Sequence, residues 1–267
     1  MSSLLEVRSL SKCFVEHTAL FRNKKNYVVN EISFTLEKGE TLTIIGENGS
    51  GKSTLVKMIA GVIKPTSGEI RFLDHLLTFG DYKFRAKHIR MLFQDPNNAF
   101  DPNHNIGQIL DSSLKLATDL NEAQRNQKIF QTLELVGMHP EHALMPINEA
   151  SSNQKQRVAF ARALILDPDI IVIDDTLSTL DFSLRIQIIN LMLKLQQRNA
   201  ISYIYVGQHL GIAKHISDKI LVMQHGKMLE YGNTKEVLLN PQSPFMNRLI
   251  DSHFGKKLTE ESWANIE

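Results

Sequence analysis

The chain has 267 residues, 42% of them hydrophobic and 22% charged, which is enough apolar material for one large globular domain or two joined lobes. Its 30 lysines and arginines nearly balance 29 aspartates and glutamates, so the overall charge of +1 indicates no nucleic-acid partner. The single cysteine, Cys13, excludes an internal disulfide and a cysteine-based metal cluster. The N-terminus lacks a signal-peptide pattern and no apolar run approaches about 18 residues, so we expect a cytoplasmic protein that does not span a membrane.

Short apolar runs punctuate the chain and predict strands. Consecutive apolar residues, as in IIVI from Ile170, are typical of strands covered on both faces of a parallel sheet. The last run contains His225-Gly226 and predicts a hairpin that turns there. The predicted strands are LLEVRSL near residue 5, EISFTL from Glu31, TLTIIG from Thr41, HIRMLFQ from His88, DIIVID from Asp169, SYIYVG from Ser202 and KILVMQHGKMLEYG from Lys219.

The stretch from Asp95 to Glu149 is polar with helical spacing of its apolar residues, and it contains no strand-like run. We therefore predict an inserted helical lobe. Low-complexity tracts and repeats are absent from the sequence, and glycine and proline occur singly at boundaries, so we expect one domain with subdomains.

The most specific local signal is GENGSGKST, which follows the predicted strand from Thr41 and opens a helix, STLVKMIAGVI, that stops before Pro65. This strand, loop and helix context predicts a P-loop, whose glycines turn backbone N–H groups toward phosphate oxygens at a helix N-terminus. We expect Lys52 to reach the β- and γ-phosphates of ATP and Ser53 to bind Mg²⁺. The predicted nucleotide-binding residues of this loop are Gly46, Asn48, Gly49, Ser50, Gly51, Lys52, Ser53 and Thr54.

A carboxylate that holds the metal should end a neighbouring buried strand. Asp174 closes DIIVID and fits this Walker B role. An aspartate at a strand end is by itself more often a turn or cap residue, so the assignment depends on its pairing with the P-loop.

With both halves in place, the order of the remaining motifs resembles the ATP-binding subunits of ABC transporters over nearly the whole chain. Gln94 in MLFQDP resembles the Q-loop, SSNQKQRVAFARAL the signature region, and STLD, which ends at Asp181, the D-loop. His209 in YVGQHL resembles the switch histidine, and Phe14 in LSKCF the aromatic residue that stacks on adenine. The segment from Gly226 to Ile250 is similar to the tail of the dipeptide and oligopeptide importer subfamily.

The resemblance implies an α/β fold: a P-loop NTPase core with a mainly parallel sheet, an antiparallel β subdomain and an inserted α-helical subdomain. We assign residues 1–94 and 155–240 to the core with its β subdomain, 95–154 to the helical subdomain and 241–267 to a C-terminal extension.

The resemblance also implies roles for single residues. His209 would hold the γ-phosphate or the attacking water, and Gln94 would contact Mg²⁺ and that water. Asp175, beside Asp174, would orient the water. The nucleotide of an opposite subunit would be bound by Ser151, Gln154 and Asp181.

The partners implied are a second ATP-binding subunit in a heterodimer, two transmembrane permease subunits and, indirectly, a periplasmic solute-binding protein. Such a subunit lies peripherally on the cytoplasmic face of the bacterial inner membrane. Its cargo would be peptides, with polyamines and antimicrobial peptides as further candidates, and no nucleic acid.

The signature segment departs from the family pattern. The family has LSGGQ where this chain has ASSNQ, Ala150 to Gln154, so Ser152 and Asn153 replace two glycines that permit close backbone approach and unusual φ. Asn tolerates left-handed geometry, whereas a serine Cβ can crowd a phosphate. Ser151 and Ser152 also fit ordinary N-caps of a helix from Asn153 to Leu166.

The residue after Asp174 is the second departure, because the family has glutamate where this chain has Asp175. The shorter side chain withdraws the carboxylate by about 1.5 Å, and a misplacement on that scale can slow a reaction about 100-fold. We expect ATP binding to be less affected than hydrolysis.

Three functions remain open from the sequence. The favoured one is an energy-coupling ATPase of a transporter, and the first alternative is a regulatory subunit that binds nucleotide with little hydrolysis. A soluble ABC ATPase of DNA repair or translation is a third, but such proteins carry a long coiled-coil insertion or two cassettes, for which this chain leaves no space.

Overall fold

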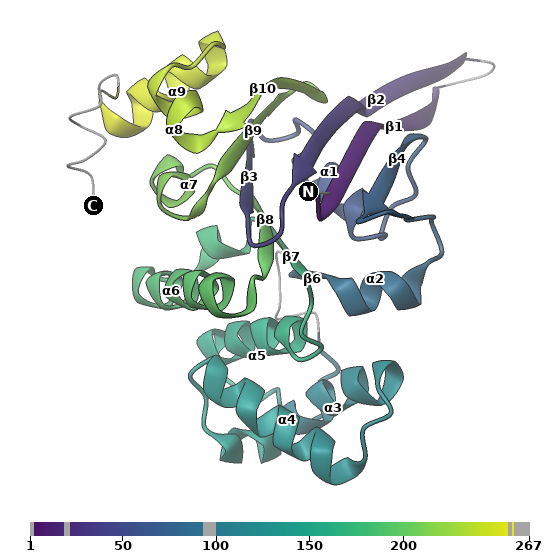
Figure 1. The fold of residues 1–267 in the computed structure, drawn as a ribbon, viewed down its shortest axis with the longest axis vertical. Helices are drawn as coiled ribbons and strands as arrows, with labels where there is room; N and C mark the ends of the chain where they lie inside the picture. Colours follow the sequence, from purple (N-terminus) through teal and green to yellow (C-terminus); the bar gives the residue numbers. More distant parts are fainter. Residues whose placement is uncertain (1–2, 19–21, 93–99, 256–257, 259–267) are drawn as a thin grey trace. The chain divides into compact units, whose positions relative to one another are not determined.

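The computed structural model describes residues 3–18, 22–92, 100–255 and 258. The chain divides into two compact units (Figure 1). Unit 1 comprises Met1–Phe79 with Ile204–Glu267, and unit 2 comprises Gly80–Tyr203. Each unit combines strands with helices, which confirms the predicted α/β class. The finer division into core, helical subdomain and C-terminal extension stays a prediction.

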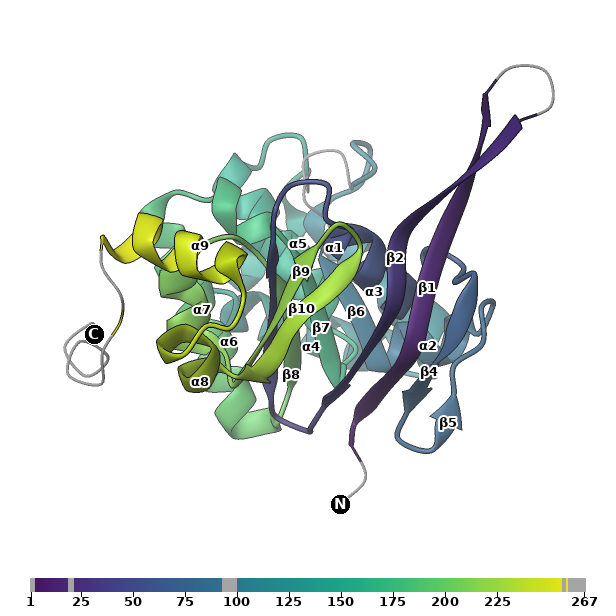
Figure 2. The same ribbon diagram turned by 90° about the horizontal axis from the view of Figure 1, so that it is seen from above.

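Unit 1 contains an antiparallel sheet in the order β2-β1-β4-β5. Figure 2 shows β1 and β2 side by side as a long ribbon. Only parts of this ribbon are apparent in the sequence, because the described side chains toward its outer end, residues 13–15 and 25–27, are half-buried or exposed and form no buried face. The bounds are β1 Leu5–Thr18, β2 Arg22–Leu36, β4 Ser67–Phe72 and β5 His75–Leu76.

Unit 1 also contains the strands β3, β9 and β10. All six residues of β3 are buried. β3 pairs in parallel with β9, as its continuous apolar run predicts. The hairpin from β9 to β10 turns at His225 and Gly226, which have φ of 49° and 77° and confirm the predicted turn. The elements are β3 Thr41–Gly46, α1 Lys52–Ile59, α7 Leu210–Ile216, β9 Lys219–Gln224, β10 Lys227–Asn233, α8 Thr234–Leu239 and α9 Pro244–Phe254.

Unit 2 contains β6 and β7, which pair in parallel. Helices precede β6, lie between the two strands and follow β7 in the sequence. Strand β8, Ser202–Val206, crosses the boundary between the units. Within the described part of residues 95–149 there are helices and one isolated bridge, in agreement with the predicted helical character. The elements are α2 Tyr82–His88, β6 Ile89–Leu92, α3 Ile106–Ala117, α4 Glu122–Leu135, η1 Pro140–Leu144, α5 Ser152–Leu164, β7 Ile170–Asp174, η2 Thr176–Thr179 and α6 Phe182–Asn199.

Capping boxes fix where several helices of unit 2 begin. In α3, α4 and α5 the N-cap side chain accepts from the backbone N–H of a glutamine three residues later, whose side chain bonds back to the N-cap N–H. The N-caps are Asn105, Asn121 and Ser151.

Among the helices that the structure describes, none is long and apolar enough to cross a membrane.

Candidate nucleotide site

Lys52 lies at the centre of the predicted P-loop, as the first residue of α1. Its side chain is buried, with 7% of the residue exposed. The Nζ atom donates to the carbonyl oxygens of Gly46 and Glu47, both at 2.7 Å, and to Ser50 Oγ at 3.4 Å. The loop therefore turns oxygens toward an ammonium group that it holds in place, and a γ-phosphate would offer that ammonium stronger acceptors.

Gly51 is required by both conformation and space. Its φ is 99°, in the region that L-residues avoid, and a Cβ there would lie 2.1 Å from the carbonyl oxygen of Val28 in β2. As N-cap of α1, Gly51 brings no side-chain capping bond to the helix N-terminus. The first amides of α1 thus meet the loop without a protein side chain as cap, which is the arrangement that binds phosphate oxygens.

The structure also places three further residues of the predicted loop, Gly49, Ser53 and Thr54, without testing their roles. Gly49 has φ of 79° and would have open space around a Cβ, so only its conformation favours glycine. Ser53 is exposed and Thr54 half-buried in the first turn of α1. A hydroxyl in that place is accessible to a cation, and the magnesium role of Ser53 stays a prediction.

The loop that carries His209 is tied to the P-loop within unit 1. Gln208 Nε2 donates to Asn48 Oδ1 at 2.6 Å. His209 follows as the N-cap residue of α7, and its exposed side chain makes no capping hydrogen bond. The structure therefore brings together the P-loop and the segment of the predicted switch histidine.

Phe14 lies on β1 with 42% of its surface exposed, so it is not a core residue. It pairs with Asn26 on β2, two residues before the Val28 carbonyl that abuts Gly51. Two residues of strand span about 7 Å, which places Phe14 near the P-loop along this ladder. The Nζ of Lys12 lies 5.0 Å from the ring centroid, so one face of the ring meets a cation.

Asp174 is the last residue of β7 in unit 2, and Asp175 follows it. Asp174 is buried, with 4% exposed, as expected of a carboxylate at the end of a buried strand. Asp175 is half-buried with φ of 50° and ψ of 17°. Aspartate tolerates this left-handed conformation better than most residues, including glutamate, so the residue at this position suits its backbone.

The signature segment begins α5 as an ordinary capped helix. Ser151 Oγ accepts from the N–H of Gln154 at 3.3 Å, and Gln154 Oε1 accepts from the N–H of Ser151 at 2.9 Å. Ser152 and Asn153 are exposed in the first turn of the helix, and neither has positive φ. Side chains in place of the family's glycines therefore bring no backbone strain here, so any effect comes from the side chains themselves.

Asn153 contacts the predicted D-loop. Asp181, the N-cap of α6, accepts from the N–H of Leu184 at 2.9 Å and also bonds the Asn153 side chain. The Leu184 amide is the main cause that lowers the pKa of Asp181, and Asn153, the Ser183 amide and the Arg157 charge add to it. The asparagine that replaces a glycine thus links the signature segment to the D-loop.

This link predicts a titration change. In the Asn153→Ala variant we expect the pKa of Asp181 to rise, but to stay below that of an ordinary aspartate because Leu184 still donates. A depressed folded-state pKa stabilises the protein above the unfolded-state pKa, and that contribution is lost as pH falls through the folded value. Carboxyl NMR titration measures this, with Ser152→Ala as the control. An unchanged Asp181 titration in Asn153→Ala would show that the amide is not its partner.

The predicted site residues divide between the units. The P-loop, Phe14 and His209 belong to unit 1, whereas Asp174, Asp175, the signature segment and Asp181 belong to unit 2. Gln94 lies outside the described residues. In the described part of the chain, no group of three or more His, Cys, Asp or Glu side chains could hold a metal. A magnesium site that uses a hydroxyl, one carboxylate and phosphate oxygens is consistent with this finding.

Three contacts were missing from the sequence prediction: the Val28 carbonyl against Gly51, Gln208 on Asn48, and Asn153 on Asp181. Only the contact of Gln208 could have been suspected from the sequence, because Gln208 directly precedes the predicted switch residue His209. A carbonyl has no signature in the sequence, and the partner of an exposed amide is not specified by spacing.

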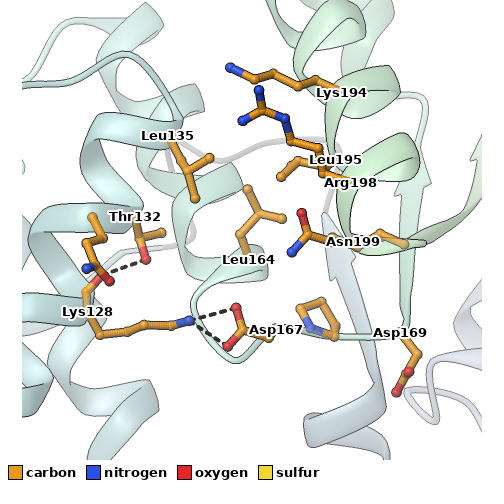
Figure 3. A pocket seen from close by; sticks show the side chains of 13 residues that line it. Lys128, Thr132, Leu135, Leu164, Asp167, Asp169, Lys194, Leu195, Arg198 and Asn199 are labelled. Carbon is orange, nitrogen blue, oxygen red and sulfur yellow. Dashed lines mark hydrogen bonds and ion pairs between the residues drawn. The ribbon is translucent and has the colours of Figure 1, made fainter.

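A separate cavity of about 240 Å³ lies in unit 2 (Figure 3). Lys128 of α4 reaches Asp167 beside it, with Nζ 2.7 Å from Oδ1. Asp169, which also lines it, precedes the first residue of β7, whereas Asp174 is the last residue of that strand. Ligands of open α/β sheets bind outside the carboxyl ends of the strands, so this cavity lies at the wrong end of β7 for the nucleotide.

Comparisons with known proteins show which family the chain resembles. A family model described as ABC transporter matches residues 29–178. The chain is 52% identical to the putrescine export system ATP-binding protein SapF of Escherichia coli strain K12 and 51% identical to the peptide transport system ATP-binding protein SapF of Salmonella typhimurium strain LT2, with 98% of each chain covered. In fold, it is similar to cbiO1 from Clostridium perfringens, part of the ABC transporter complex cbiONQ, with a TM-score of 0.76 and 24% identity over 96% of this chain and 97% of that one.

The family match covers the P-loop through β7, and the relatives extend over almost the full length. This chain belongs to the ABC transporter family.

Proposed function

We propose that this chain is the ATP-binding, energy-coupling subunit of a membrane transporter and that it hydrolyses ATP. The observation that carries the proposal is the P-loop, in which a buried Lys52 is held by loop oxygens beside a glycine that leaves no room for a side chain. Family membership favours this function over a regulatory subunit without turnover.

The chemistry assigned to the site is mostly electrostatic positioning. Lys52 and the loop amides bind the β- and γ-phosphates, and Phe14 stacks on adenine. Ser53 and Asp174 provide hard oxygen ligands that fit Mg²⁺, with Gln94 as a third candidate. When bound, Mg²⁺ neutralises phosphate charge. Asp175 orients the attacking water, and His209 holds that water or the γ-phosphate.

The proposed cargo is peptides, with polyamines and antimicrobial peptides as further candidates. Relatives that share about half of the residues are named for peptide transport and for putrescine export. The cargo pathway itself would be formed by other subunits, because a cytoplasmic ATPase supplies energy and not a pore.

The proposed partners are a second, different ATP-binding subunit, two transmembrane permease subunits and, indirectly, a periplasmic solute-binding protein. We place the chain peripherally on the cytoplasmic face of the bacterial inner membrane. In a shared site, Ser151, Gln154 and Asp181 would face the partner's nucleotide, while this chain's P-loop would face the partner's signature.

Such an arrangement separates the two departures from the family pattern. Asp175 would act on the ATP of this chain, whereas Ser152 and Asn153 would face the ATP of the partner. We infer that the two sites of the complex are unequal. Rapid hydrolysis at the same rate in both sites of the purified complex would contradict this inference.

Single-turnover ATP hydrolysis by the complex tests the proposed function. We expect the unaltered chain to exceed the Lys52→Ala background, and Asp175→Glu to accelerate hydrolysis by up to about 100-fold because its carboxylate reaches further. Thermal unfolding serves as the control, since glutamate suits the left-handed backbone of Asp175 less well.

If only Asp175→Glu turns over while both proteins bind ATP equally, the chain is instead a subunit that binds nucleotide to control its partner. If neither protein binds ATP, both functions are wrong.

A further inference from the structure

Helix α9 packs on α7 within unit 1. Apolar side chains of both helices join one buried cluster with β3 and β9. Met246 and Ile250 of α9 are four residues apart and face this cluster, and His253 follows three residues later on the same side of the helix. The cluster residues of the two helices are Leu210, Ala213, Phe245, Met246 and Ile250.

His253 forms two contacts with the start of α7. Its Nε2 atom accepts from the backbone N–H of Gly211 at 3.2 Å. Its ring meets the His209 ring edge-on, with centroids 5.8 Å apart and planes at 81°. An accepting Nε2 places the ring proton on Nδ1, so the contact requires a neutral imidazole.

The Gly211 amide belongs to the first turn of α7, where backbone N–H groups have no partner within the helix. The N-cap residue normally satisfies one of them, but the side chain of His209 makes no capping bond. His253 supplies the acceptor from another helix. The His209 imidazole can therefore be used for other contacts without leaving this amide unsatisfied.

We propose that His253 is a positioning residue, which holds the start of α7 and thereby the orientation of His209 toward the nucleotide. This inference rests on the proposed function, in which His209 contacts the γ-phosphate or the attacking water. It assigns a role in hydrolysis to α9, outside the P-loop, signature and D-loop motifs.

The protonation state of His253 agrees with this role. Partial burial, with a smaller effect of the nearby His209, lowers the pKa of His253. The neutral form, which can accept from Gly211, therefore prevails at pH 7.

Two substitutions of His253 distinguish the effect of its hydrogen-bond acceptor from the effect of its aromatic ring. His253→Phe keeps an aromatic ring beside His209 but removes the acceptor, whereas the Oε1 of His253→Gln can accept from Gly211 without a ring. In the complex with its partner subunits, we expect His253→Phe to lower kcat about fivefold at unchanged KM for ATP, since one exposed hydrogen bond is lost and the P-loop is intact. We expect His253→Gln to restore most of the kcat.

Hydrogen–deuterium exchange of the segment from Gln208 to Ile216 gives a readout that does not depend on hydrolysis. Exchange should be about fivefold faster in His253→Phe and near the wild-type rate in His253→Gln. His215→Phe, an exposed histidine in the last turn of α7, is the matched control and should change neither readout.

Equal loss of kcat in both His253 variants, or no change in exchange for His253→Phe, would overturn the proposal. If the wild-type complex does not hydrolyse ATP, the proposed function fails, and the exchange data alone decide whether His253 holds α7.

Discussion

Lys52→Ala should reduce ATP hydrolysis by about 100- to 1,000-fold, which is the effect of removing one preorganised charged donor from a transition state. The ammonium is buried and already directed by Gly46, Glu47 and Ser50, so little reorganisation is needed before it meets a phosphate. ATP affinity should fall less, by about tenfold, because the loop amides remain. Single-turnover hydrolysis and equilibrium nucleotide binding measure the two effects.

Lys57→Ala is the matched control for this substitution. Lys57 lies on the same helix but is only half-buried and is not part of the P-loop motif. It should hydrolyse ATP at the wild-type rate. An equal loss in both variants would show that charge on α1 matters in general, and retention of hydrolysis in Lys52→Ala would remove the P-loop from the mechanism.

Gly51→Ala should destabilise the fold and abolish nucleotide binding. The left-handed φ costs about 1–2 kcal/mol for an L-residue. In addition, the new Cβ would lie 2.1 Å from the Val28 carbonyl oxygen, so β2 or the loop must move. We expect a loss of about 3 kcal/mol or more in the free energy of unfolding, with a displaced P-loop.

Gly80→Ala is the control that separates the cost of the left-handed φ from the cost of the steric clash. Gly80 has a similar φ of 107°, but no atom lies within 4 Å of a Cβ built there. It should lose only the conformational contribution and should bind ATP normally. Thermal unfolding and ATP binding of the two variants provide the comparison. Equal destabilisation of both would mean that the Val28 contact has no effect.

Much of the fold was predictable from local patterns. The buried runs of β3 and β7, the hairpin at His225-Gly226 and the α/β class all follow from apolar continuity and turn chemistry. The long ribbon of β1 and β2 and the short strand β4 were less apparent, because their residues are partly exposed and their pairing depends on distant partners.

The bounds of one helix in unit 2 were closely predicted. The helix predicted from Asn153 to Leu166 runs from Ser152 to Leu164, since Ser151 and Gln154 form a capping box that fixes its start. The helix STLVKMIAGVI, predicted to stop before Pro65, is α1 from Lys52 to Ile59, so it ends earlier than predicted.

The sequence by itself determined which groups form the P-loop. Its glycines, lysine and hydroxyl are neighbours in the sequence, so the local backbone conformation is enough to bring them together. Only the tertiary structure decided which distant groups meet this loop and its neighbours. Gln208 reaches Asn48 across 160 positions, and His253 reaches Gly211 across 42. The packing of α9, α7 and the sheet determines these partners. The sequence spacing of an exposed amide or imidazole does not predict which distant group it will hydrogen-bond.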